Sequence, residues 1–214
     1  MVNGLLLLHT SPVHVPVFDA LRDRCHPGAG LRHLVAPHLL DRARAEGPES
    51  VAPALLGLLA EAGPSPVLVT CSTIGAVAEA LAPALGVPVL RVDRPMAAAA
   101  VRTGPRIAVL ATVESTLTPT GELLAEEARA AGAAVSVRTQ LVAGAWERFE
   151  AGDAQGCLAR VAAAVEAVTD ADVVVLAQAS MAAAAELAAS RIPVLSSPAP
   201  GLAAGLELVS RHTA

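Results

Sequence analysis

The stretch Val67-Leu-Val-Thr-Cys71-Ser-Thr-Ile74 decides the fold, because Val174-Val-Leu-Ala-Gln178-Ala-Ser-Met181 repeats its pattern at an offset of 107 residues. Two further pairs of segments follow in the same order. They are Val87-Pro-Val-Leu90 with Ile192-Pro-Val-Leu195, at an offset of 105, and Leu8-His-Thr10 with Leu110-Ala-Thr112, at an offset of 102. Three ordered matches with small drift predict a duplicated lobe. The alternative is one Rossmann-like sheet in which the Val-Pro-Val-Leu similarity is accidental.

Short β-branched or leucine-rich runs alternate with alanine-rich stretches throughout, which is typical of parallel α/β sheets. We expect strands at Gly4–Leu8, Leu31–Val35, Val67–Thr70, Val87–Val92, Arg106–Ala111, Ala134–Arg138, Val173–Ala177 and Ile192–Leu195. We expect helices at Val15–Arg24, Ser50–Ala62, Ile74–Leu85, Pro95–Val101, Pro119–Ala131, Cys157–Val168, Met181–Ala189 and Gly201–Ser210. Thr118 before Pro119 predicts an N-cap followed by proline at the first helical position. The repeat predicts a first α/β lobe over residues 1–100, completed by about residues 196–214, and a second lobe over residues 101–195.

The composition narrows the classes of partner. Hydrophobic residues make up 54% of the chain, aromatic residues 1%, and the net charge is −5. Few aromatic side chains and no basic cluster argue against nucleic-acid binding. No apolar run approaches the roughly 20 residues that span a bilayer, and no signal peptide is recognised, so we expect no membrane contact and a cytoplasmic location. Self-association is left open.

The cysteines and glycines indicate neither a metal nor a nucleotide cofactor. Cys25, Cys71 and Cys157 are odd in number and have no CxxC spacing, which argues against a disulfide framework and a zinc site. The histidines are scattered, and no P-loop or GxGxxG motif is present. We therefore expect an enzyme that uses no cofactor and no metal.

Small polar residues stand where the expected strands end, and ligands of open parallel sheets bind at these ends. In the first lobe they are His9, Thr10, Ser11, Cys71, Ser72 and Thr73; in the second they are Thr112, Ser115, Thr116, Gln178, Ala179 and Ser180. Lobes that face each other would place both sets around one cleft. We take these residues as the candidate substrate-binding set, with Cys71 as the candidate catalytic residue.

Cys71 has two interpretations. A thiol at a helix N-terminus experiences unpaired N–H groups and the positive end of the helix dipole, which favour the thiolate. The same N–H groups, with the hydroxyls of Ser72 and Thr73, form a natural carboxylate site. A bound carboxylate would then hold its α-carbon near the sulfur. The alternative is an inert cysteine buried at the end of a core strand.

Several segments together resemble the aspartate/glutamate racemase superfamily, which includes hydantoin racemase, maleate isomerase and arylmalonate decarboxylase. They are Thr70-Cys71-Ser-Thr-Ile-Gly75, Arg91-Val-Asp-Arg-Pro-Met96, Ala111-Thr112 with Ser115-Thr-Leu-Thr-Pro119, Gly144-Ala-Trp with Ala151-Gly-Asp153, and Val175-Leu-Ala-Gln-Ala-Ser-Met181. The resemblance implies two pseudo-symmetric flavodoxin-like lobes with parallel sheets and an active site in the cleft between them. It also implies cofactor-independent proton chemistry at the carbon next to a carboxylate, with one cysteine from each lobe.

The sequence departs from this pattern at the second cysteine. Cys71 matches the first, but Gln178 stands where the second would be, and an amide cannot carry a proton as a thiol does. His9, at the end of the first strand, could act as an acid or base, or could hydrogen-bond and support its loop. Glu114 lies in the corresponding loop of the second lobe, where a solvated carboxylate is the commoner role. Cys157 is more simply explained by packing.

Three functions remain open at this stage. The first is a racemase-like isomerase that acts on a small carboxylate or carbonyl acid through Cys71. The second is a single-thiol decarboxylase or lyase of the same superfamily. The third is a carboxylate-binding protein that has lost its proton-transfer pair. Deuterium incorporation from solvent separates the first two from the third, and release of carbon dioxide separates the second from the first.

Overall fold

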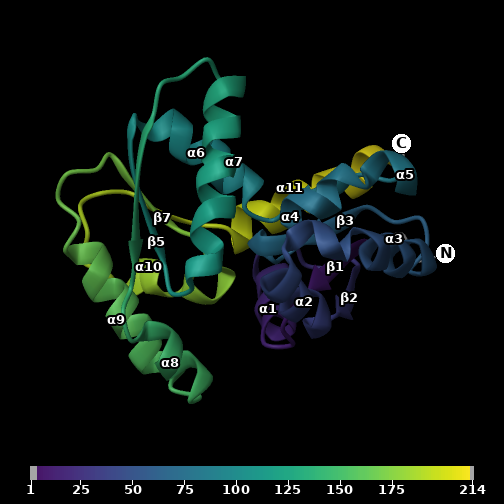
Figure 1. The fold of residues 1–214 in the computed structure, drawn as a ribbon, viewed down its shortest axis with the longest axis horizontal. Coiled ribbons are helices and arrows are strands. Elements are labelled where there is room, and N and C mark those ends of the chain that lie inside the picture. Colours follow the sequence, from purple (N-terminus) through teal and green to yellow (C-terminus); the bar gives the residue numbers. More distant parts are fainter. Residues whose placement is uncertain (1–3, 213–214) are drawn as a thin grey trace. The chain divides into compact units, whose positions relative to one another are not determined.

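The computed structural model describes residues 4–212, which form two compact units. The first unit comprises residues 1–92 and 198–214, and the second comprises residues 93–197. Each unit contains one four-stranded parallel sheet with helices on both faces (Figure 1). The two sheets have the same strand order, β2-β1-β3-β4 and β6-β5-β7-β8. The structure therefore shows a duplicated α/β unit and rules out the single continuous sheet.

The first sheet consists of β1 (Leu5–His9), β2 (Leu31–Val35), β3 (Val67–Val69) and β4 (Val89–Arg91). One face packs against α2 (Pro37–Glu46), the short helix η1 (Pro48–Val51), α3 (Ala52–Glu61) and α4 (Ser72–Ala80), with α5 (Ala82–Leu85) following. The other face packs against α1 (His14–Cys25) and the C-terminal helix α11 (Pro198–His212), drawn in yellow in Figure 1. Strands buried on both faces explain the continuous apolar run Leu5–Leu8.

The second sheet consists of β5 (Arg106–Ala111), β6 (Ser136–Leu141), β7 (Val173–Leu176) and β8 (Val194–Ser196). One face packs against α6 (Arg94–Thr103) and α7 (Leu117–Ala130), which follows the short helix η2 (Glu114–Thr116). The other packs against α8 (Ala145–Glu150), α9 (Ala154–Glu166) and α10 (Ala184–Leu187). A third short helix, η3 (Ala179–Met181), follows β7. Within this unit, Figure 1 shows α7 as the long teal helix.

All eight expected strands are found among residues 4–212, but three expectations need correction. The boundary between the units lies at Val92 and Asp93, so α6 belongs to the second unit. Its apolar residues Met96, Ala97, Ala100 and Val101 pack in the core around β5 and β7. Thr118 is not an N-cap, because α7 already begins at Leu117 with Thr116 before it. Helix α2 was not expected from its mixed sequence.

Candidate active site

Cys71 lies between the end of β3 and the start of α4, as the sequence predicts. Its backbone is extended, with φ −110° and ψ 116°, and its side chain makes no capping hydrogen bond to the helix. The thiol is half-buried and packs at the margin of the core beneath α4. Among the described residues, the hydroxyls of Ser72 and Thr73 have no hydrogen-bond partner. The first turn of α4 therefore presents N–H and O–H donors that a carboxylate could accept.

Thr10 and Ser11 lie at the same edge of the first sheet as Cys71. They follow β1, which pairs with β3 in the register Leu8 to Val69. The backbone N–H of Thr70 also donates to the carbonyl of Leu8 at 2.9 Å, which extends this pairing toward Cys71. Thr10 is buried and Ser11 is half-buried. Neighbouring strand ends thus bring together most of the first-lobe candidates.

His9 is hydrogen-bonded within the first unit, which corresponds to the supporting role that the sequence left open beside proton transfer. Its side chain is fully buried, its ring lies tilted against that of Phe18, and both ring nitrogens are bonded within the first unit. Nδ1 lies 2.8 Å from Oγ1 of Thr70, and Nε2 lies 2.8 Å from Nδ1 of His33. Burial, with the charges of His33 and His14, lowers the pKa of His9 to about 3. His9 is therefore neutral and hydrogen-bonded within the first unit.

Gln178 occupies the matching position in the second unit, directly before η3, with an extended backbone (φ −130°, ψ 140°). Its Oε1 accepts from the backbone N–H of Thr112 at 2.6 Å, from the Thr112 hydroxyl at 2.9 Å and from the N–H of Val113 at 3.3 Å. Its Nε2 has no partner among the described residues. The side chain is thus fixed through its oxygen and keeps its amide hydrogens available.

Thr112 was expected to bind substrate, but both of its donors are engaged by Gln178. Thr112 therefore holds Gln178 in place, and its contact with a substrate stays a prediction. Ser115 and Thr116 lie in η2, where Thr116 is buried. Among the buried side-chain oxygens and nitrogens that the structure describes, Oγ of Ser115 alone lacks a partner. Ala179 is buried in η3 beside the half-buried Ser180, so this strand end offers Ser115 and Gln178 as its free donors.

The other two cysteines show different environments. Cys157 is buried in the core between α9 and the second sheet, and burial, followed by the charge of Asp153, raises its pKa. This environment fits the packing role expected from the sequence. Cys25 is exposed at the end of α1. Cys71 differs from both because it lies between the end of a strand and the start of a helix.

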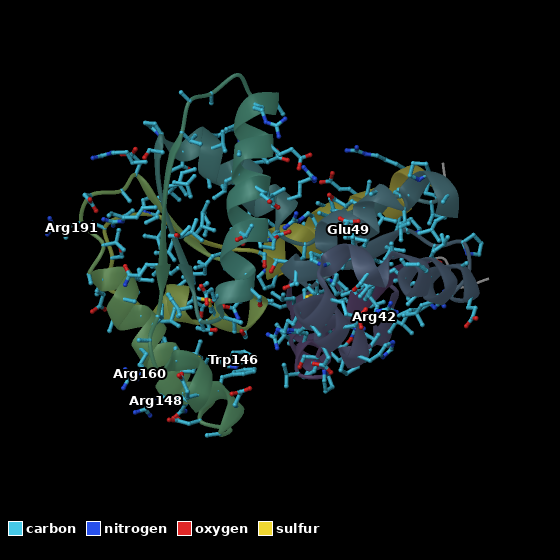
Figure 2. All side chains as sticks on the ribbon, in the orientation of Figure 1. Arg42, Glu49, Trp146, Arg148, Arg160 and Arg191 are labelled. Carbon is cyan, nitrogen blue, oxygen red and sulfur yellow. The ribbon has the colours of Figure 1, made fainter. Side chains whose placement is uncertain are left out.

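Trp146, labelled in Figure 2, stacks with Phe149 on α8, with ring centroids 5.3 Å apart. Phe149 also packs against the core beneath α9. This agrees with the packing interpretation of their spacing. Within residues 4–212, no group of three or more histidine, cysteine, aspartate or glutamate side chains is arranged to hold a metal ion. In the same residues no helix is long and apolar enough to cross a membrane.

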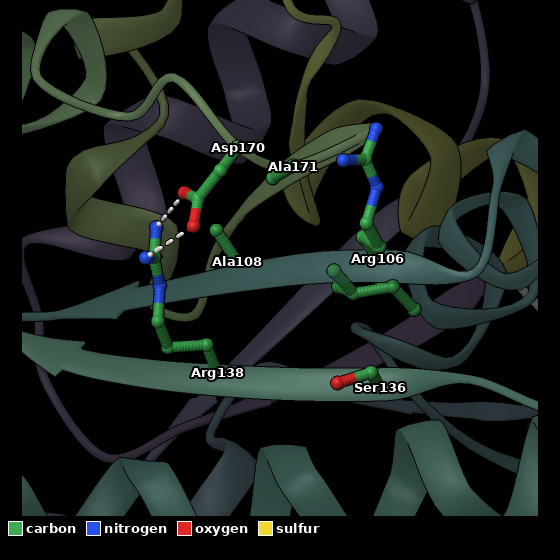
Figure 3. A pocket seen from close by; sticks show the side chains of 7 residues that line it. Arg106, Ala108, Ser136, Arg138, Asp170 and Ala171 are labelled. Atoms are coloured by element: carbon green, nitrogen blue, oxygen red, sulfur yellow. Dashed lines mark hydrogen bonds and ion pairs between the residues drawn. The ribbon is translucent and has the colours of Figure 1, made fainter.

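A cavity of about 220 Å³ lies at the opposite end of the second sheet, where its strands begin. Figure 3 shows Arg106 on β5, Ser136 and Arg138 on β6, and Asp170 and Ala171 before β7. Both arginines are paired, Arg138 with Asp170 at 2.8 Å and Arg106 with Asp172 at 2.6 Å. Since the positive charges are neutralised and the strand carboxyl ends lie at the far edge, this cavity is separate from the candidate active site.

Sequence reasoning did not find the hydrogen-bonded group of His9, His33 and Asp19. In the sequence, His33 is one of several scattered histidines. The register of β1 with β2 places His33 opposite Leu7, two residues from His9, on the same face of the sheet. A histidine in each of two neighbouring expected strands is the sequence signal that could have indicated this group.

Comparisons with known proteins identify a family and several solved structures of similar fold. The chain matches the family model described as Asp/Glu/Hydantoin racemase over residues 14–204. It is similar to a glutamate racemase from Bacillus anthracis, with 18% identity and a TM-score of 0.69, covering 98% of this chain and 82% of that one. It is also similar to an aspartate racemase from Picrophilus torridus, with 16% identity and a TM-score of 0.67, covering 97% and 94%.

A third similar structure is a glycine-to-cysteine mutant of arylmalonate decarboxylase, with 16% identity and a TM-score of 0.63, covering 97% of this chain and 93% of that one. No match was found among curated protein sequences. At these identities the solved structures show a shared fold. The family model covers most of the chain and confirms the resemblance seen in its motifs. This protein belongs to the Asp/Glu/hydantoin racemase family.

Proposed function

We propose that this protein is a cofactor-independent, racemase-like isomerase that acts on a small carboxylate or carbonyl acid through Cys71. The observation that carries the proposal is the position of Cys71 before α4, beside two hydroxyls without partners. N–H groups at a helix N-terminus bind anions and favour a thiolate. One short segment thus supplies both a carboxylate site and a base.

The proposed chemistry is removal of a proton from the carbon next to the bound carboxylate. The thiolate of Cys71 takes the proton, so an S–H bond forms as the C–H bond breaks. The C–H electron pair moves into the carboxylate and gives an enediolate, which the donors of Ser72, Thr73 and the helix N-terminus stabilise as its charge develops. Return of a proton to carbon completes an exchange or an isomerisation.

Gln178 cannot be the second proton carrier, because an amide neither accepts nor delivers a proton under these conditions. We propose that its free Nε2 hydrogens donate to a substrate oxygen, with Oγ of Ser115 as a further donor. This role is supported by the three bonds that fix Oε1 and leave Nε2 unpaired. Thr10, Ser11 and Ser180 are proposed as further substrate contacts.

A second candidate is a decarboxylase or another lyase. The single thiol favours it, because loss of carbon dioxide from a dicarboxylic acid leaves an enediolate that needs a proton from one face only. In that case the carbon–carbon bond breaks, its electron pair stays on the substrate, and the S–H of Cys71 gives its proton to carbon. Similarity in fold to an arylmalonate decarboxylase structure is compatible with this second route.

The test is proton NMR in deuterium oxide with a panel of small carboxylic acids, malonates and hydantoins. We expect wild-type protein to exchange the α-proton of at least one compound, and Cys71→Ala and Cys71→Ser to abolish that exchange. Cys25→Ser is the matched control, because Cys25 is an exposed thiol outside the site.

Carbon dioxide release from a malonate would assign the lyase reaction. Near-normal exchange by Cys71→Ala would refute the thiol mechanism, and binding without exchange would indicate a carboxylate-binding protein.

A further inference from the structure

Four side chains of the first unit form a continuous hydrogen-bonded series that the proposed reaction leaves unused. Asp19 Oδ1 lies 3.4 Å from His33 Nε2, and His33 Nδ1 lies 2.8 Å from His9 Nε2. His9 Nδ1 in turn lies 2.8 Å from Thr70 Oγ1. The series runs from the partly exposed carboxylate of Asp19 on α1, through β2 and β1, to the residue next to Cys71.

The direction of each hydrogen bond follows from the Thr70 end. The Thr70 hydroxyl donates its one hydrogen to the carbonyl of Leu8 at 3.1 Å, so its oxygen must accept from His9 Nδ1–H. His9 is neutral, because burial and the charges of His33 and His14 lower its pKa to about 3. Its Nε2 therefore carries a lone pair and accepts from His33 Nδ1–H. His33 then satisfies Asp19 only when Nε2 is also protonated.

Whether every hydrogen bond of the series forms therefore depends on the protonation of His33. The groups that contact it are His9 on β1 and Asp19 on α1. His14 on α1 lies beside His9, with ring centroids 6.3 Å apart. Arg22 pairs with Asp19 at 2.9 Å and so shares its charge. On α11, which packs beside α1, Arg211 and Glu207 pair with each other at 3.2 Å and are well exposed. Histidine is the side chain that ordinarily changes charge between about pH 5 and 8.

Thr70 links the series to the thiol. Its backbone N–H and its hydroxyl both donate to the carbonyl of Leu8, and its oxygen also accepts from His9. The side chain of Thr70 is directed to the face of the sheet that carries α1, while Cys71 packs at the core on the other face. Thr70 is followed directly by Cys71 and then by the first turn of α4.

We propose that His33 is a positioning residue, which acts through His9 and Thr70 to hold the strand end that carries Cys71. This rests on the proposed function only for the importance of Cys71, since the placement of the thiol can be measured without a substrate. The series becomes complete when His33 holds both protons, so the environment of Cys71 should depend on whether His33 is bonded to Asp19.

The test is the rate of iodoacetamide labelling at Cys71, read by mass spectrometry between about pH 5 and 8. His33→Asn keeps a donor near the position of Nδ1 but cannot ionise or reach Asp19, whereas His33→Leu removes both bonds. The matched control is His38→Asn, at an exposed histidine of α2. Cys25 and Cys157 report general changes in exposure within the same samples.

We expect the ratio of wild-type to His33→Asn labelling rates at Cys71 to change with pH by roughly two- to tenfold, the effect of one hydrogen bond. His33→Leu should change the rate by a similar factor at every pH, and His38→Asn should match wild type. Asp19→Asn should weaken the pH dependence of labelling at Cys71, because the carboxylate that accepts from doubly protonated His33 is lost. Asp23→Asn should not, although Asp23 also pairs with Arg22 on the same helix.

A long-range proton–nitrogen NMR spectrum gives an independent readout. We expect His9 to remain neutral with its proton on Nδ1 throughout this pH range, in wild type and in His33→Asn. A constant ratio for a folded His33→Asn variant, or His9 protonated on Nε2, would overturn the proposal. If His33→Leu does not fold, His33→Asn decides alone. Failure to exchange any acid would refute the proposed function and leave the labelling result standing.

Discussion

Cys71 and Gln178 stand at equivalent places in two units of the same topology, yet their side chains are held in different ways. The thiol of Cys71 caps nothing, whereas the oxygen of Gln178 is bound by three donors from the end of β5. Such a fixed amide resembles a preorganised hydrogen-bond donor, which is more effective than a mobile one because no reorganisation is needed on binding. In the proposed function, Cys71 transfers the proton and Gln178 orients the substrate.

Gln178→Glu isolates the proposed donor at this position. A carboxylate oxygen can replace Oε1 on the same three donors, so we expect urea unfolding at neutral pH to resemble that of wild type. The variant lacks the Nε2 hydrogens, and we expect the affected rate or binding constant to fall by roughly ten- to a hundredfold, as the loss of a hydrogen bond to a charged group implies.

Gln178→Ala provides the contrast. It leaves the Thr112 and Val113 donors without their partner, so we also expect a loss of unfolding free energy of about 1–3 kcal/mol. Steady-state kinetics and NMR titration with an active acid measure the effect of both variants. Wild-type binding by Gln178→Glu would show that Nε2 makes no contact with the substrate.

The sequence predicts residues at strand ends better than it predicts what they contact. Cys71 and Gln178 could be placed because an apolar run ends directly before each of them. The contacts of His9 and Thr112 could not be predicted, because both side chains are bonded to side chains distant in sequence. His9 contacts His33 through the β1–β2 register, and Thr112 contacts Gln178 across 66 residues. Such pairings depend on how strands align, which local patterns do not specify.

Helix α9 illustrates a helix start fixed by one side chain. Oδ1 of Asp153 accepts from the N–H of Gly156 at 2.8 Å, and Oδ2 pairs with Arg148. The hydrogen bond from Gly156, then that from Arg148, lowers the pKa of Asp153. A carboxyl whose pKa is lower in the folded state stabilises the protein above its unfolded pKa, and that stability is lost as pH falls through the folded pKa.

We expect Asp153→Ala to lower the melting temperature at neutral pH, and the difference from wild type to shrink below about pH 4, where the unfolded carboxyl is protonated. Asp153→Asn should keep the capping bond and most of the stability at neutral pH. Thermal unfolding by circular dichroism at a series of pH values measures all three proteins. A difference between wild type and Asp153→Ala that does not vary with pH would contradict the assignment.

Two glycines in helices should respond to alanine in opposite directions. A Cβ on Gly201 in α11 would overlap the backbone oxygen and Cγ2 of Val92, whereas a Cβ on Gly57 in α3 would meet nothing within 4 Å. We expect Gly201→Ala to lower the unfolding free energy by about 1–3 kcal/mol through overpacking. Gly57→Ala should raise it by about 0.5–1 kcal/mol, because alanine favours helix. Urea unfolding decides, and equal effects would contradict the close packing of α11.

At the level of elements, apolar periodicity was sufficient for the strands and insufficient for some helices. Helix α2 buries only Leu39 and Ala43, and half of its residues are polar or charged, so its sequence lacks a broad apolar stripe. The start of α7 was placed too late because Thr118 and Pro119 look like a cap and a first helical residue. In the structure, η2 runs directly into α7, and proline occupies the first turn.

The first unit is discontinuous in sequence, whereas the second is one unbroken segment. Leu5, Leu7 and Leu68 on the first sheet pack against α11, whose residue Leu202 is buried. We expect an isolated fragment of residues 93–197 to fold and to unfold cooperatively. A fragment of residues 1–92 should not, because the part of its sheet that α11 covers would be exposed. Circular dichroism melts of the two fragments test this, and a cooperative transition for residues 1–92 would contradict it.

The duplication and the α/β class could be predicted from the ordered repeat, and the family match confirms the resemblance carried by the motifs. The boundary of the second unit could not, because the alanine-rich sequence of α6 fits a helix in either unit. What assigns it is the packing of Met96 and Ala100 against the core around β5 and β7. Packing partners of this kind are specified by three-dimensional shape rather than by sequence period.

The insertion of one unit within the other also sets an order of events on the ribosome. Every residue of the second unit is synthesised before residue 198, so that unit can fold while the chain is still growing. The unit that carries Cys71 has its sheet early but must wait for α11 to cover it. N-terminal domains ordinarily fold first during translation. Here the later-encoded unit should be complete first, and an incomplete nascent chain should expose the leucine-lined face of β1 and β3 to chaperones.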